Sequence, residues 1–279
     1  MTGLTKSPER STRNVVLIAL GAVVIAATYL YLILFQPTDI ADGLGSSSFV
    51  AIVGYLLGAG LIVVGTMHRL PTTTIAMVPV AIAVNIVIGQ LTSVLGLPLY
   101  LDSIGTILVA CLAGPAAGAA TGALTNVIWG MTISPVALPF AVTSVVIGVL
   151  AGYAARTGVF RKFVLVPVAG LLTGVVAALV SAPIAAFVFG GTTAAGTGAL
   201  VGAFRAMGNS LLASTTMQGL LSDPIDKAVT FTVVMLILGA MPSRFRQRFP
   251  FVRTHRVFGK APAAAPAATA TTEQPGTQA

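Results

Sequence analysis

Long apolar runs separated by short polar segments dominate the pattern along this chain. A helix needs about 20 apolar residues to cross the hydrocarbon of a bilayer. The first run is longer than the apolar part of a signal peptide, about 7–15 residues, so it indicates a retained helix. The pattern predicts membrane-spanning helices over Asn14–Phe35, Phe49–Thr66, Thr74–Val94, Ala137–Ala155, Phe163–Phe189 and Ile225–Met241.

Two further stretches are ambiguous. Leu101–Gly130 is apolar but is broken by Gly114-Pro115, so it is either one long span or two short spans joined by a tight turn. Its first half would rise only about 20 Å, which requires a helix packed inside the bundle or ending in a protein-lined cavity. Ala194–Gly219 is rich in small and hydroxyl residues and has Arg205 near its middle.

The distribution of the 15 Lys and Arg residues selects one topology, because basic residues collect on the cytoplasmic side. If Gly114-Pro115 is a cytoplasmic turn and Ala194–Gly219 is not a span, eight spans place 13 of the 15 in the cytoplasm. A seven-span arrangement places 9 of them outside. Counting Ala194–Gly219 as a span buries Arg205 in lipid, at about 2.5–3.5 kcal/mol. We therefore expect eight helices with both termini cytoplasmic.

Composition agrees with a lipid-embedded fold. Hydrophobic residues make up 56% of the chain and charged residues 8%, with a mean hydropathy of +0.97. This excludes a soluble globular domain, a disordered protein and a nucleic-acid-binding domain. We predict an all-α protein of the plasma membrane. Its segments are a cytoplasmic N-terminus (1–13), two helices (14–70), a six-helix core (71–242), a basic cytoplasmic segment (243–260) and a disordered tail (261–279).

Polar side chains within the spans are few, and each has an ordinary interpretation as an interhelical hydrogen bond or an interfacial anchor. Together, however, they converge toward the outer side of the membrane around the short hairpin. This favours an outward-facing pocket for a small polar or aromatic ligand. The candidate ligand-binding residues are Asn85, Gln90, Tyr100, Asp102, Asn126, Trp129, Arg205 and Asn209.

Small residues four positions apart form two rows, one at Gly114, Gly118 and Gly122 and one from Gly170 to Ala186. Such rows let helices approach closely, and packing within the chain is the simpler interpretation. The alternative is a surface that docks onto another membrane subunit. A basic segment after the last span offers a cytoplasmic docking patch at Arg244, Arg246 and Arg248.

Several kinds of chemistry lack the residues they need. Cys111 is the only cysteine, and no lysine follows the phosphate-binding pattern of an ATPase. Asp223 to Lys227 are interpreted as opening the last span, where Pro and acidic residues suit a helix N-terminus. On that interpretation no carboxylate lies mid-span, and a proton-relay pump is not expected. We expect neither an enzyme nor a bound cofactor or metal.

Two motifs resemble a known family. Gly96-Leu-Pro-Leu-Tyr-Leu-Asp-Ser-Ile-Gly-Thr106, followed by Ala113-Gly-Pro-Ala-Ala-Gly118 and Leu124-Thr-Asn126, resembles the substrate-binding (S) components of energy-coupling factor transporters. Asp223-Pro-Ile-Asp-Lys227 and Met241-Pro-Ser-Arg-Phe are also similar to segments of many of them. The resemblance covers roughly residues 74–250, so the first two predicted spans are additional.

The resemblance implies six core helices with a vitamin or other micronutrient bound near the outer surface beneath loops. It also implies two kinds of partner, a transmembrane coupling subunit and cytoplasmic ATPases. The third predicted span carries no clean copy of the Ala-x-x-x-Ala motif that many members use to dock. The alternatives are a self-sufficient carrier with the same pocket, and a membrane scaffold or sensor without transport.

Overall fold

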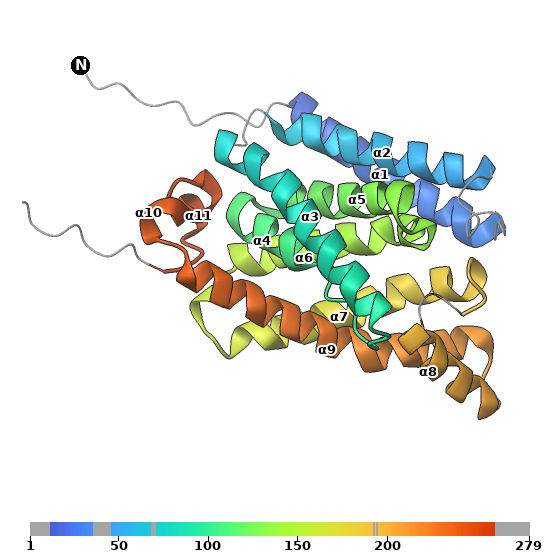
Figure 1. Ribbon diagram of the computed structural model, residues 1–279. Helices are drawn as coiled ribbons and strands as arrows, with labels where there is room; N and C mark the ends of the chain where they lie inside the picture. The colour runs from blue at the N-terminus through green and yellow to red at the C-terminus, as the bar shows by residue number, and fades with distance from the viewer. Residues whose placement is uncertain (1–11, 36–45, 68–70, 192, 194, 260–279) are drawn as a thin grey trace, which may run out of the picture.

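The computed structural model describes residues 12–35, 46–67, 71–191, 193 and 195–259. Within these ranges the chain is all-α, and it forms a bundle (Figure 1). The tail 261–279, nearly all of the segment 1–13 and residues 36–45, which connect the first two helices, lie outside the described residues. The helices are α1 (Thr12–Phe35), α2 (Ser46–Met67), α3 (Thr72–Val94), α4 (Ile104–Ala113), α5 (Pro115–Thr132), η1 (Pro135–Phe140), α6 (Ala141–Arg156), η2 (Val159–Arg161), α7 (Leu165–Phe187), α8 (Ala195–Ala206), α9 (Leu211–Ala240), α10 (Ser243–Arg246) and α11 (Pro250–His255).

Within the described ranges, four helical stretches are long and apolar enough to cross a membrane: Thr12–Phe35, Thr72–Val94, Pro135–Arg156 and Leu165–Phe187. Phe49–Gly65 and Ile104–Ala113 are shorter apolar helices. The all-α, membrane-type fold expected from the hydrophobic pattern is therefore confirmed. The eight-span count stays a prediction.

The hairpin of α4 and α5 turns where the sequence predicts it. Gly114 has φ +96°, a conformation that favours glycine, and Pro115 opens α5, where its missing N–H costs nothing. The ten residues of α4 rise only about 15 Å. Eight of them are buried, so this short helix is shielded inside the bundle, as its length requires.

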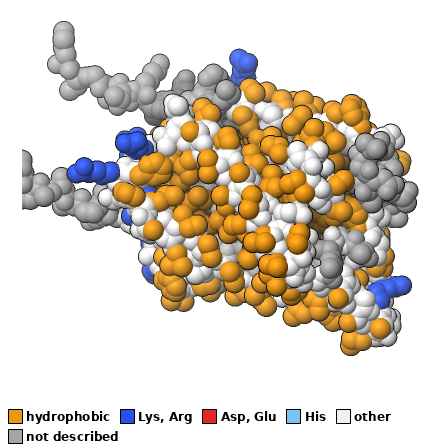
Figure 2. Space-filling view, in the orientation of Figure 1, with side chains coloured by type: hydrophobic (Ala, Val, Ile, Leu, Met, Phe, Trp, Pro, Cys, Tyr) orange, Lys and Arg blue, Asp and Glu red, His pale blue; other side chains and the backbone are white. Residues whose placement is uncertain are grey.

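The helices pack in pairs, with α1 against α2, α5 against α6 and α7 against α9. The α1–α2 pair lies along α5 on one flank of the bundle (Figure 1). Basic side chains gather at the end that carries α10 and α11, and another lies at the α8 end (Figure 2). The flanks between these ends are largely apolar, as expected for a surface facing lipid.

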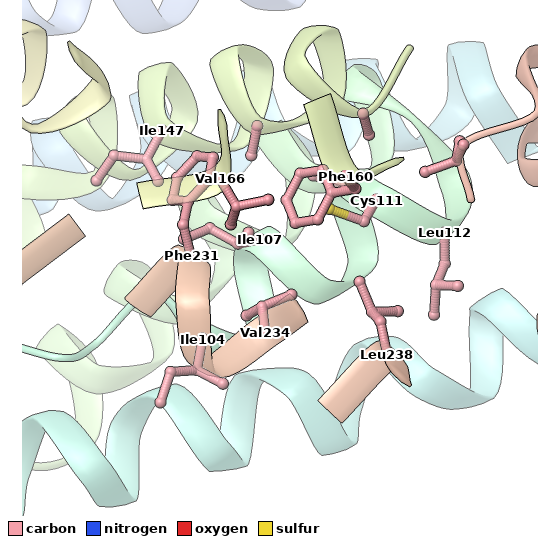
Figure 3. Close-up of a cluster of buried hydrophobic side chains, with 14 of the residues drawn as sticks. Ile104, Ile107, Cys111, Leu112, Ile147, Phe160, Val166, Phe231, Val234 and Leu238 are labelled. Carbon is pink, nitrogen blue, oxygen red and sulfur yellow. The ribbon is translucent and has the colours of Figure 1, made fainter. Parts of the chain in front are cut away.

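A dense apolar cluster fills the half of the bundle nearest α10 and α11 (Figure 3). The rings of Phe160 and Phe231 stack with centroids 6.0 Å apart, and Ile107 and Leu238 pack beside them. Cys111 is fully buried in the same cluster, so it serves as a small packing residue.

The structure corrects the predicted start of the last helix. Asp223 to Lys227 do not open a span, because α9 begins at Leu211 and continues unbroken past them. The start is capped by Ser210, whose hydroxyl accepts a hydrogen bond from the Ala213 backbone N–H at 3.2 Å. Pro224 lies inside α9, where its ring removes one helical hydrogen bond without ending the helix.

The small-residue rows pack within the chain. A Cβ added to Gly118 would lie 2.9 Å from the Gly148 carbonyl oxygen, and one added to Gly122 would lie 2.5 Å from the Ser144 carbonyl oxygen. The ring of Phe251 covers Gly114. The second row meets α9 through Gly170 and Gly174 in the same way. These contacts occupy the face of Gly114, Gly118 and Gly122, which favours packing within the chain. Docking of a partner on these residues stays a prediction.

A matched pair of glycine substitutions tests this packing. Gly122→Ala places a methyl group against the backbone of α6 and should lower the free energy of unfolding by about 1–3 kcal/mol. Gly60→Ala meets no atom within 4 Å and should be neutral or stabilise the helix by up to about 1 kcal/mol. Thermal unfolding in detergent measures both. Equal stability of the two variants would contradict close contact of α5 with α6.

Candidate functional site

A cavity of about 110 Å³ lies between α3, α5, α6, α7 and α9, beneath the connection between α3 and α4. Its size is of the same order as the roughly 150 Å³ cavity that holds a benzene molecule in a well-studied case. Its wall combines carboxylates, hydroxyls and aromatic rings. The lining residues are Gly89, Thr92, Ser93, Leu97, Leu99, Tyr100, Asp102, Asn126, Trp129, Ser134, Val136, Ala137, Phe140, Thr143, Ser144, Ile147, Ala177, Ser181, Thr193, Asp223 and Lys227.

The connection between α3 and α4 (residues 95–103, the α3–α4 loop) enters the bundle as non-helical backbone. The Asp226 carboxylate accepts hydrogen bonds from the Tyr100 and Leu101 backbone N–H groups, at 3.1 and 2.7 Å. The Thr92 hydroxyl donates to the Tyr100 carbonyl at 2.7 Å. Non-helical backbone is tolerated at membrane depth only where the protein supplies such partners. The loop can therefore form the roof of a cavity inside an apolar bundle.

Lys227 is the only cation among the residues that line the cavity, and it is already paired. Its ammonium contacts the Asp226 carboxylate directly and the Asp102 carboxylate at 3.4 Å. The side chains of Lys227 and Asp226 are 4% and 0% exposed. Asp102 also accepts a hydrogen bond from the Ser103 hydroxyl at 2.8 Å. Two carboxylates, those of Asp226 and Asp102, thus contact one ammonium group, and Asp223 lines the same cavity.

Asp223 has only weak partners. The hydroxyls of Ser222 and Ser181 lie 3.4 and 3.5 Å from its carboxylate. Each hydroxyl has one hydrogen and a closer acceptor, the Gln218 carbonyl at 3.1 Å and the Ala178 carbonyl at 3.2 Å. The buried Asp223 carboxylate therefore faces the cavity with its hydrogen-bonding capacity largely unused.

The opposite wall is aromatic and hydroxylic. The Trp129 indole N–H donates to the Gln90 side-chain oxygen at 3.1 Å, and its ring lies against Gly89, where no larger residue fits. Asn126 donates to the Ser144 hydroxyl at 2.8 Å. Thr143, which is 8% exposed, lines the cavity, and its hydroxyl has no hydrogen-bond partner.

The two N-terminal helices brace this wall from outside. The Tyr55 hydroxyl of α2 donates to the Pro139 carbonyl of η1 at 3.2 Å. The Tyr29 hydroxyl of α1 donates to the Val180 carbonyl of α7 at 3.1 Å. Because η1 contributes Phe140 to the cavity, α1 and α2 hold part of the wall in place.

Half of the candidate binding residues line the cavity, namely Tyr100, Asp102, Asn126 and Trp129. Their contact with a ligand stays a prediction. Gln90 lies behind Trp129 and orients it. Asn85 is away from the cavity and donates to the Thr106 and Thr125 hydroxyls, at 2.9 and 3.1 Å. Its side-chain oxygen accepts from the Gly105 N–H at 2.7 Å, so Asn85 joins α3, α4 and α5.

Two candidate residues lie elsewhere. Arg205 is exposed on α8, and its guanidinium donates to the Asn209 carbonyl at 3.4 Å. The Asn209 side chain donates to the Phe204 carbonyl at 3.0 Å. Neither residue lines the cavity, and their contact with a ligand stays a prediction. They close the turn between α8 and α9 instead.

Sequence reasoning missed Asp223 and Lys227, which do line the cavity. A signal existed, because residues four apart share a helix face and an acid–base pair at that spacing marks a polar face. The interpretation as a helix start concealed it. The hydroxyls of Thr143 and Ser144 carried no comparable signal, since such residues are common in membrane helices.

The basic segment after α9 lies at the opposite end of the bundle. Arg244 and Arg248 are exposed, whereas the Arg246 guanidinium lies 4.9 Å from the centre of the Phe258 ring. Arg246 therefore helps to hold this end of the chain together, and docking of a partner on Arg244 and Arg248 stays a prediction. No group of three His, Cys, Asp or Glu side chains in the described ranges could hold a metal ion.

Comparisons with protein-family models, with curated proteins and with solved structures found no match to this chain.

The buried cluster of Lys227, Asp226 and Asp102 should contribute to the free energy of unfolding. Lys227→Met leaves Asp226 and Asp102 without a cation and should lower the free energy of unfolding by about 3–5 kcal/mol. Adding Asp226→Asn to that variant removes one of the stranded charges and should restore part of the loss. Denaturation of the purified variants measures both effects. Lys227→Met with wild-type stability would show that the cluster does not hold the α3–α4 loop.

Proposed function

We propose that this chain is the membrane-embedded substrate-capture subunit of an energy-coupling-factor-type importer. It binds a small water-soluble nutrient from outside the cell and delivers it together with a transmembrane coupling subunit and cytoplasmic ATPases. The observation that carries this proposal is the polar cavity roofed by the α3–α4 loop within an apolar bundle.

The apolar cluster supports capture rather than free passage. Ile147 lines the cavity and also belongs to that cluster (Figure 3), which includes Val252 of α11. A solute in the cavity faces close-packed side chains such as Phe231 on that side. Release toward α10 and α11 then requires the helices to rearrange, and a coupling subunit driven by ATP hydrolysis could supply that work.

The proposal includes the eight-span topology with both termini cytoplasmic. The basic end at α10 and α11 faces the cytoplasm, in line with the preference of Lys and Arg for that side. The cavity and α8 then lie toward the outside. In this arrangement α9 is the last span, and α8 is an outer helix that does not cross.

Cysteine labelling in a Cys111→Ser background tests the topology. Pro98→Cys and Met207→Cys lie at exposed positions of the α3–α4 loop and the α8–α9 turn and should react with a membrane-impermeant reagent from outside. Thr157→Cys, exposed after α6, should react only after the membrane is opened. Labelling of Thr157→Cys in intact cells would overturn the orientation.

One observation favours a second candidate function, a self-sufficient carrier. Asp223, Asp226 and Lys227 are buried near the middle of α9, not at a helix start, so the expectation that no acid lies mid-span loses its basis. Buried ionisable residues in membrane helices are typical of ion or proton pathways. Asp226 and Lys227 have structural partners in the α3–α4 loop, which leaves Asp223 as the residue that a coupled ion would use.

Reconstitution separates the two functions. Proteoliposomes containing this chain alone should bind substrate but not accumulate it under sodium, proton or electrical gradients. Adding the coupling subunit and ATPases should give ATP-dependent uptake, and ATPases lacking the catalytic glutamate provide the control. Gradient-driven accumulation by the chain alone would refute the capture subunit and establish the carrier.

A further inference from the structure

Resting on the proposed capture function, we propose that the cavity selects a small organic cation. The ligand class is a compound with about one ring and an ammonium or protonated nitrogen. Asp223 is its counter-ion, assisted by Asp102, and Trp129 and Phe140 contact its apolar part.

Carboxylates outnumber ammonium groups around the cavity. Lys227 is shared between Asp226 and Asp102, and Asp226 also accepts two backbone hydrogen bonds. Asp226 is therefore fully satisfied inside the protein. No cation among the described residues approaches Asp223 closely enough to form an ion pair. An unpaired buried carboxylate is costly, and a cationic ligand is one way to compensate it.

A second, independent observation points to a ligand. Thr143 of α6 lines the cavity, the residue is more than nine-tenths buried, and its hydroxyl makes no hydrogen bond. Buried polar groups normally have partners. Thr143 on α6 and Asp223 on α9 thus present an unused hydroxyl and an underused carboxylate to the same cavity, and both can accept a hydrogen bond from a ligand N–H.

The aromatic residues and the volume of the cavity limit the size and the apolar part of the ligand. A cation over an indole or phenyl face is attracted by the ring electrons, and Trp129 is the strongest such ring. About 110 Å³ leaves room for roughly one ring, on the scale of the benzene cavity noted above. A bare metal ion would use neither aromatic ring, and no group of described residues has the ligands to hold one.

An anionic ligand fits the cavity poorly. It would approach Asp223 and Asp102, and Lys227 is the only lining cation and already contacts two carboxylates. Like charges brought together in a poorly hydrated cavity repel strongly. The wall therefore discriminates by repulsion of anions as well as by attraction of cations.

The fluorescence of Trp129, the only tryptophan in the chain, reports directly on the cavity. The full chain, purified in detergent, is titrated with three one-ring probes of similar size: benzylammonium, benzyl alcohol and benzoate. We expect benzylammonium to bind at least about tenfold more tightly than the other two. Asp223→Asn should weaken benzylammonium binding about tenfold or more, since a charge-assisted hydrogen bond is lost.

Two threonine variants provide a matched control. Thr143→Val removes the unused hydroxyl and should weaken benzylammonium binding, whereas Thr132→Val changes an exposed hydroxyl on α5 that bonds only its own helix and should not. Thermal unfolding confirms that each variant is folded. Asp223→Asn relieves repulsion among carboxylates, so it should be at least as stable as the wild type.

Each remaining outcome is decisive. Tighter binding of benzyl alcohol or benzoate would overturn the cation proposal but leave the capture function standing, because the cavity would still bind a solute. Unchanged benzylammonium affinity in Asp223→Asn would overturn the assignment of the counter-ion. No Trp129 response to any probe by the folded protein would count against the ligand class and the capture site together.

Discussion

The carboxylate of Asp226 holds the structure of the site together. It bonds the backbone N–H groups of Tyr100 and Leu101 and pairs with Lys227, so the inner end of the α3–α4 loop is held against α9 with these two N–H groups satisfied. Without such partners, non-helical backbone could not stay among apolar helices. The loop takes the place of a further helical turn before Ile104, so α4 is short. Loop residues such as Tyr100 form part of the cavity wall.

The same cluster links stability to recognition. Lys227 pairs with Asp226 and Asp102, so no ion pair with Lys227 is formed by Asp223. Buried polar groups without adequate partners are tolerated where function requires them. The hydroxyl of Thr143 shows the same property on the facing helix. Polar groups at the cavity thus lack partners within the protein. The other half of the bundle, around Phe160 and Phe231, is closely packed.

Most of the helices could be predicted from sequence because lipid imposes a simple rule of length and apolarity. The Gly114-Pro115 turn was also predictable, since its two residues suit the end of one helix and the start of the next. The site was harder to predict. Asp226 bonds residues some 125 positions away, and such pairing has no local signature. The glycines of α5 pack on α6 for a similarly non-local reason, as Gly122 contacts Ser144.

If the cavity opens outward and prefers cations, a cysteine in its wall should show both properties directly. Thr143→Cys in a Cys111→Ser background places a thiol in the cavity wall. In sealed right-side-out vesicles, an impermeant cationic methanethiosulfonate should modify this thiol from outside, and faster than its anionic counterpart of similar size. Modification only after the vesicles are opened, or faster modification by the anionic reagent, would contradict the account.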